Sequence, residues 1–149
     1  MDNRVKVILS ILGGITGYLF GGLDALLEAF TIILIVDTIT GMSKSYYKGT
    51  YRSKKFRQGL WKKMGYMLAI ILAVQLDRIL GNTGTLRTAL LFCFIANEST
   101  SIIENLGEMG VPIPNILARS IAILKDKSES NMQSEQTETK KQVQETFEG

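Results

Sequence analysis

The chain has 149 residues, of which 46% are hydrophobic, and a formal net charge of +3 at pH 7. It contains no histidine and one cysteine, which excludes a disulfide framework, histidine metal sites and the usual hydrolytic triads. Because no phosphate-binding loop or nucleophile motif is present either, we expect no enzymatic activity, no metal site and no cofactor.

Apolar and polar residues are segregated along the chain. Residues 7–43 and 64–104 hold most of the apolar side chains, whereas residues 44–63 and 125–149 are polar. Soluble domains interleave the two kinds of residue, so this segregation indicates a membrane protein.

Four apolar segments predict an all-α membrane protein with four transmembrane helices in two helical hairpins. A bilayer core of about 30 Å needs roughly 20 apolar residues, and each segment has close to that length. A short turn-like stretch separates the two members of each pair, at 21–24 and at 81–85. The first segment could also be a secretory signal, but no small-residue cleavage pattern follows it. The predicted spans are about 7–23, 25–43, 64–81 and 86–104.

The first segment carries a ridge of glycines at four-residue spacing, Gly13, Gly17 and Gly21. Glycine lets two helices approach closely, so this ridge predicts a packing face. The spacing does not decide whether the ridge packs within its own hairpin or against another subunit.

A basic segment, residues 44–63, joins the two predicted hairpins and contains no acidic residue. Its interleaved aromatic residues would also suit a nucleic-acid patch, but its place between apolar spans favours a cytoplasmic loop on the membrane surface. We therefore expect contact with an anionic inner leaflet, no nucleic acid, and both termini in the cytoplasm. The basic residues are Lys44, Lys48, Arg52, Lys54, Lys55, Arg57, Lys62 and Lys63.

Polar side chains inside the apolar segments form a predicted stripe. An ionised group near the bilayer centre costs about 3 kcal/mol, so such groups face other helices or water. Interhelical hydrogen bonding would account for any one of them, and a pore lining would account for the set; both interpretations stay open. The stripe consists of Asp37 in the second segment and Asn97, Glu98, Ser101, Glu104 and Asn105 in the fourth.

The C-terminal region follows two prolines, at 112 and 114. Apolar residues at helical spacing over 113–124 predict a short amphipathic helix, either on the inner membrane face or packed on the bundle. Residues 125–149 are rich in Ser, Gln, Glu, Thr and Lys, which predicts a disordered cytoplasmic tail. The chain would then comprise a membrane domain, 1–124, and this tail.

Several motifs resemble the toxin-secretion and phage-lysis holin family of Gram-positive phages and clostridial toxin loci. The resemblance covers about residues 10–124, and its most specific part is IANESTSIIENLGEMGVPIP (95–114). Supporting motifs are GYLFGGLDALL (17–27), VDTITG (36–41), GLWKKMGYML (59–68) and LDRILG (76–81).

This resemblance implies a protein of the bacterial cytoplasmic membrane that accumulates harmlessly and then assembles with copies of itself into lesions. The lesions pass a phage endolysin or a large toxin, without any need to bind it. The polar stripe would be buried before assembly opens and would meet water afterwards. The chain departs from many holins in having no methionine between Met1 and Met42 that could serve as a second start, and its tail is long for the family.

Two other functions remain as alternatives. A small transporter or channel would need a site near the bilayer midplane, usually at a broken helix, and no segment is conspicuously broken. A membrane-bound recruiter of a soluble partner would act through the basic segment or the tail.

Overall fold

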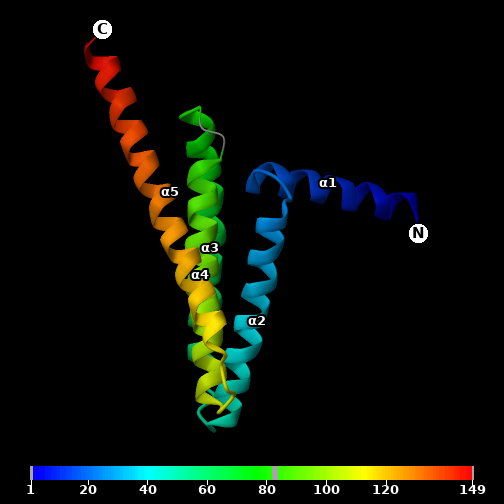
Figure 1. Ribbon diagram of the computed structural model, residues 1–149. Coiled ribbons are helices and arrows are strands. Elements are labelled where there is room, and N and C mark those ends of the chain that lie inside the picture. Colours follow the sequence, from blue (N-terminus) through cyan, green and yellow to red (C-terminus); the bar gives the residue numbers. More distant parts are fainter. Residues whose placement is uncertain (1, 82–83, 149) are drawn as a thin grey trace.

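The computed structural model describes residues 2–81 and 84–148, and over these ranges the chain is helical with no strand. The expected all-α class is confirmed. Helices α2, α3 and α4 run alternately down, up and down as a bundle, α5 returns beside α4, and α1 projects from the top (Figure 1). The helices are α1 (Asn3–Phe20), α2 (Ala25–Tyr47), α3 (Ser53–Ile79), α4 (Thr85–Glu108) and α5 (Asn115–Glu148).

The turn between α1 and α2 has sharp local signals. Gly21 ends α1 in the left-handed conformation, with φ of 74°, and the Gly22 amide donates to the Gly17 carbonyl at 2.8 Å. This is a Schellman ending, which glycine adopts without strain. Asp24 then begins α2, because its carboxylate accepts a hydrogen bond from the Leu27 amide at 2.9 Å.

The first predicted hairpin, of residues 7–23 and 25–43, is not formed in this structure. Helix α1 contacts α3 and projects at a wide angle instead of lying along α2 (Figure 1). Its C-terminal end is held by α3 and α4, since Arg78 donates to the Tyr18 carbonyl at 2.7 Å and Arg87 donates to the Phe20 carbonyl. These contacts come from residues distant in the sequence, which is why the local pattern did not predict the direction of α1.

The predicted glycine ridge of α1 has few neighbours within the chain. A Cβ atom at Gly13 would meet nothing within 4 Å, and one at Gly17 would touch Leu23 at 3.9 Å. Gly21 differs, because a Cβ atom there would lie 3.1 Å from side-chain atoms of Arg87 and of Val74. Only the last glycine of the ridge is therefore closely packed here.

The basic segment is mostly helical, where the sequence predicts a loop. Residues 44–47 end α2, 48–52 form the turn, and 53–63 begin α3. Lys, Arg, Gln and Leu favour helices, so α3 starts well before its apolar part. Gly49, with φ of 62°, lies in the short turn that remains.

Helix α5 runs without interruption through the region predicted to be a short amphipathic helix and a disordered tail. No glycine or proline occurs between 115 and 148, and the many Glu, Gln and Lys residues there are good helix formers. Ile121 and Leu124 are partly buried, and Leu124 packs against the core of the bundle. Of the two placements predicted for this amphipathic segment, the structure has the one on the bundle.

The bundle has a small core where α2, α3 and α4 meet. The rings of Tyr66 and Phe94 stack with centroids 4.2 Å apart, and Phe30 lies beside them. The buried apolar residues of this core are Leu27, Phe30, Leu34, Ile70, Leu91 and Ile95.

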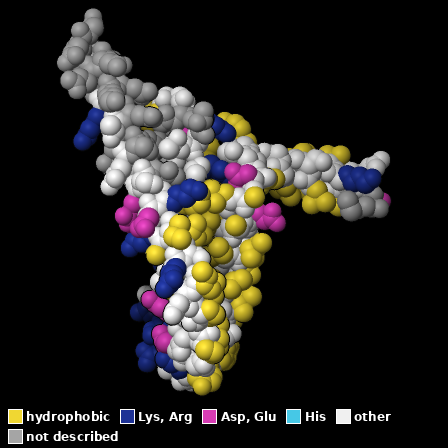
Figure 2. All heavy atoms as spheres, viewed as in Figure 1, with side chains coloured by type: hydrophobic (Ala, Val, Ile, Leu, Met, Phe, Trp, Pro, Cys, Tyr) yellow, Lys and Arg dark blue, Asp and Glu magenta, His cyan; other side chains and the backbone are white. Residues whose placement is uncertain are grey.

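Large apolar side chains also cover the outside of the bundle. Ile32, Ile35 and Ile39 of α2 are each more than half exposed, and Figure 2 shows hydrophobic side chains along one side of the molecule. Soluble monomers rarely expose contiguous apolar patches of this kind. Within the described ranges, α2 and α4 are long and apolar enough to cross a membrane.

Candidate functional site: a charge cluster in the helical bundle

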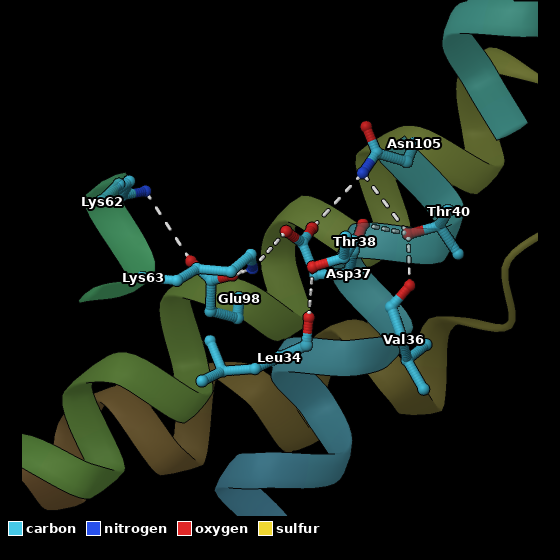
Figure 3. Close-up of polar contacts among 9 residues, drawn as sticks. All are labelled: Leu34, Val36, Asp37, Thr38, Thr40, Lys62, Lys63, Glu98 and Asn105. Carbon is cyan, nitrogen blue, oxygen red and sulfur yellow. Dashed lines mark hydrogen bonds and ion pairs between the residues drawn. The ribbon is translucent and has the colours of Figure 1, made fainter. Parts of the chain in front are cut away.

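Lys63 of α3 lies between two carboxylates, Asp37 of α2 and Glu98 of α4 (Figure 3). Its Nζ atom is 2.9 Å from Oδ2 of Asp37 and also donates to Oε2 of Glu98. The side chains of Lys63, Asp37 and Glu98 are only 16%, 14% and 3% exposed. A single ammonium group therefore links all three helices of the bundle.

Lys62 completes the charge balance of the cluster. Its Nζ atom lies 3.7 Å from Oε1 of Glu98, although 63% of its side chain is exposed. With Lys62 included, two cations face two carboxylates, so the cluster is neutral when all four groups are ionised. Buried ions are tolerated when they are paired and hydrogen-bonded in this way.

Uncharged polar groups surround the other side of Asp37 (Figure 3). The Asn105 amide donates to Oδ1 of Asp37 at 3.3 Å and to the Thr40 hydroxyl at 3.4 Å. Ser101 of α4 also lies near the Asp37 carboxylate. Thr38 instead donates back to the Leu34 carbonyl of its own helix, at 2.7 Å.

The predicted stripe is divided between two faces of α4. Glu98, Ser101 and Asn105 meet Asp37 inside the bundle, as described above. Asn97 and Glu104 are exposed on another face, and the Asn97 amide reaches the sulfur of Cys93 at 3.9 Å. Positions 97 and 104 are seven residues apart and so share a face, which is offset by one residue, about 100°, from that of 98 and 105.

The basic residues do not form one surface group. Lys62 and Lys63 pair with Glu98, while Lys44 and Lys48 pair with Glu108 at the end of α4. In the described part of the chain, no ion pair involves Arg52, Lys54, Lys55 or Arg57.

The prediction of Lys63 as a membrane-surface residue is therefore wrong. The sequence held a signal for its true position, because Lys63 lies three and seven residues before Tyr66 and Ile70, on the face of α3 that enters the core.

A second set of polar contacts lies at the opposite end of the bundle. Arg87 donates to Asp24, with Nη1 2.7 Å from Oδ2, and to the carbonyls of Phe20 and Gly22. The Arg87 guanidinium holds the pKa of the Asp24 carboxyl below its usual value of 3.8.

Buried Asp77 of α3 caps the start of α4. It accepts hydrogen bonds at 3.0 Å from the backbone amides of Leu86 and Arg87, which satisfies the N-terminus of α4.

The chemistry available to the cluster is limited to charge and hydrogen bonding. Among the residues that the structure describes, no group of three or more His, Cys, Asp or Glu side chains could hold a metal ion. The carboxylates of Asp37 and Glu98 are engaged by lysine ammonium groups. The cluster can hold three helices together, and it can become hydrated when those helices separate.

Two apolar helices of spanning length and a buried charge network define a small all-helical membrane protein. Residues 14–126 match the family described as the bacteriophage holin family. The chain belongs to this family, which is non-enzymatic, and the resemblance seen in the motifs is thereby confirmed.

Similar proteins occur in bacteria and in a phage. A protein of Listeria innocua described as uncharacterized is 37% identical over 128 residues, covering 86% of this chain and 91% of its own length. A probable holin of Bacillus phage phi105 is 35% identical over 107 residues, covering 72% and 78%. An uncharacterized 14.9 kDa protein from the nagH 3' region of Clostridium perfringens is 32% identical over 126 residues, covering 84% and 96%. No solved structure matches the chain.

Proposed function

We propose that this chain is a working holin, which accumulates in the bacterial cytoplasmic membrane and assembles with copies of itself into lesions. The lesions would release an endolysin to the cell wall and so cause host lysis. Family membership and the likeness to a probable phage holin support this role. A large toxin is the other cargo that the motif resemblance implies.

The observation that carries the proposal is the charge cluster around Lys63. In the closed bundle its charges neutralise one another and the middle of α2 exposes Ile32, Ile35 and Ile39, which suits a subunit surrounded by lipid. Separation of α2, α3 and α4 exposes Asp37 and Glu98, which is tolerable only where water is present. The same helices would thus have two packings, one closed in lipid and one around a water-filled lesion.

The outward polar residues of α4 support assembly through this helix. Asn97 and Glu104 are exposed on a helix that is apolar enough to span the membrane. Polar groups at such positions are stabilised by hydrogen bonds to another helix or by water. Before the lesion opens, Asn97 and Glu104 would form hydrogen bonds with a neighbouring copy. In the open lesion they would form hydrogen bonds with water.

We further propose four spans, α1 to α4, with both termini in the cytoplasm. The basic residues near the α2–α3 turn favour the cytoplasmic side, and Arg4 and Lys6 at the start of α1 favour the same side. For α1 to span, it must turn about Gly21 and Gly22 from the direction in Figure 1. For the C-terminus to be cytoplasmic, α5 must leave the side of α4, along which it runs away from the α2–α3 turn in this structure. A tag placed before Asp2 would then be protected in sealed right-side-out vesicles; its digestion from outside would place α1 on the outer surface.

Inducible expression in a bacterium, with and without a cytoplasmic endolysin, tests the proposed function. Membrane potential and optical density are followed together. We expect the potential to collapse abruptly after a delay, and the optical density to fall rapidly only when endolysin is present. Continued growth with an intact potential, despite full membrane insertion, would instead favour a transporter or a recruiter.

A further inference from the structure

A cavity of about 170 Å³ opens between α2 and α3 near the turn that joins them. Tyr51, Arg52 and Lys55 line it close to the turn, and Asp37 and Lys63 line its deeper part. Lys63 lies ten residues after the first residue of α3, so the cavity reaches about 15 Å along the bundle. It is therefore an elongated groove rather than a shallow surface depression.

The groove has a positive entrance. Arg52 and Lys55 are exposed, and within the described ranges neither of them makes an ion pair. The one carboxylate in the lining, that of Asp37, is already neutralised by Lys63. A guanidinium and an ammonium group without protein partners are suited to a phosphate group.

The groove becomes apolar farther from this entrance. Thr38 and Lys63 also line a second cavity of about 290 Å³ along α2 and α3. Its other walls include Leu34, Ile35 and Met67. A free phosphate ion would gain nothing from these side chains, whereas an acyl chain would bury apolar surface against them.

We propose that the α2–α3 groove binds one anionic phospholipid, with its headgroup phosphate at Arg52 and Lys55 and an acyl chain beside Leu34, Ile35 and Met67. The proposal deepens the proposed function, because it rests on the cytoplasmic position of the basic end. That position places Arg52 and Lys55 at the headgroups of the anionic inner leaflet. The lipid would be a specific ligand of the groove, in addition to the general attraction of the basic residues to the membrane.

Trp61 provides an intrinsic probe for this site. It is the only tryptophan of the chain, it is 71% exposed, and it follows Leu60, which lines the cavity. The full chain is reconstituted in phosphatidylcholine vesicles that contain a minor fraction of brominated phosphatidylglycerol or, in parallel, the same fraction of brominated phosphatidylcholine. We expect the anionic lipid to quench Trp61 more strongly, which gives its association constant relative to phosphatidylcholine.

Two double variants separate a site from general attraction. Arg52→Gln with Lys55→Gln should lower the relative association constant about tenfold, because both phosphate partners are lost. Lys54→Gln with Arg57→Gln removes the same charge from residues that do not line the cavity, and should lower the constant less than about threefold. Equal losses in the two double variants would overturn the proposal.

Two further outcomes would also overturn it. Equal quenching of the wild-type chain by both lipids would mean that the groove does not select an anionic lipid. The groove would then be a packing surface for α1 or for a second copy of the chain. Displacement of the lipid by soluble glycerol phosphate would show a site for a free phosphate group. The assay needs no lysis, so its failure leaves the proposed holin function standing, and a failed lysis experiment leaves this binding result intact.

Discussion

At the scale of single residues, Lys63 supplies the one ammonium group that two buried carboxylates share. Asp37 and Glu98 belong to different helices, and both contact the same ammonium group. An unpaired buried ion costs several kcal/mol, whereas a paired and hydrogen-bonded one costs far less. The contribution of Lys63 is therefore best measured by removing it alone and then together with its partners.

We expect Lys63→Met to lower the free energy of unfolding by about 3–5 kcal/mol, because it leaves two buried carboxylates without their shared partner. Adding Asp37→Asn and Glu98→Gln to this variant should restore most of the loss. Thermal unfolding in detergent measures both effects. Lys62→Met is the matched control and should cost less than about 1 kcal/mol, since this side chain is largely exposed. Equal losses in the two lysine variants would contradict a structural role for the cluster.

The Asp24–Arg87 pair predicts a dependence of stability on pH. Because Arg87 lowers the pKa of Asp24 in the folded protein, ionised Asp24 stabilises the fold above its usual pKa of 3.8. This stabilisation is lost as the pH falls below 3.8, through the lowered pKa. At neutral pH we expect the wild-type protein to have a higher melting temperature than the Asp24→Asn variant. The two melting temperatures should converge in acid. A difference that stays constant down to the lowest pH would contradict a stabilising role for the ionised carboxylate of Asp24.

At the scale of helices, Gly21 and Gly13 of α1 should respond differently to added side chains. Gly21 has a left-handed backbone and lies against Arg87 and Val74, whereas Gly13 has open space within the chain. We expect Gly21→Ala to cost about 1–2 kcal/mol of unfolding free energy and Gly13→Ala to add about 0.5–1 kcal/mol, because alanine is the better helix former. Unfolding of the detergent-solubilised monomer checks both values.

A larger side chain at Gly13 addresses the partner of the glycine ridge. If α1 packs between subunits, Gly13→Leu should reduce cross-linked oligomers in the membrane while leaving the stability of the monomer unchanged. Normal cross-linking with Gly13→Leu would place this face of α1 against lipid.

The sequence allowed the helical class and the main apolar segments to be predicted, because they depend on local composition. Gly21 and Asp24 are local signals too: Gly21 correctly marks the end of α1, and Asp24 correctly marks the start of α2. The direction of α1 depends on Arg78 and Arg87, about 60 residues farther along the chain, and was therefore not predictable from its own pattern. The role of Lys63 was missed for a related reason, since its partners lie on two other helices.

At the scale of the whole molecule, the bundle combines an apolar exterior with an interior that holds both an apolar core and a charge cluster. The cluster joins α2, α3 and α4, and a separate contact between Asn105 and Thr40 joins α2 directly to α4. For the charged groups to meet water, these helices must separate, and a covalent link between α2 and α4 should prevent it. A reversible link therefore tests whether opening of the bundle is part of lesion formation.

We expect the double substitution Thr40→Cys with Asn105→Cys, in a Cys93→Ser background, to leave lesion formation intact. It should also allow α2 and α4 to be linked covalently in the closed bundle. The two native side chains lie 3.4 Å apart, so oxidation or a short bifunctional thiol reagent should join the new cysteines. Cells treated before triggering should keep their membrane potential, and an added reductant should restore its collapse. Each single-cysteine variant, treated identically, controls for the reagent. Collapse on schedule while the link is intact would mean that α2 and α4 stay together in the lesion, and that the cluster serves only to hold the bundle closed.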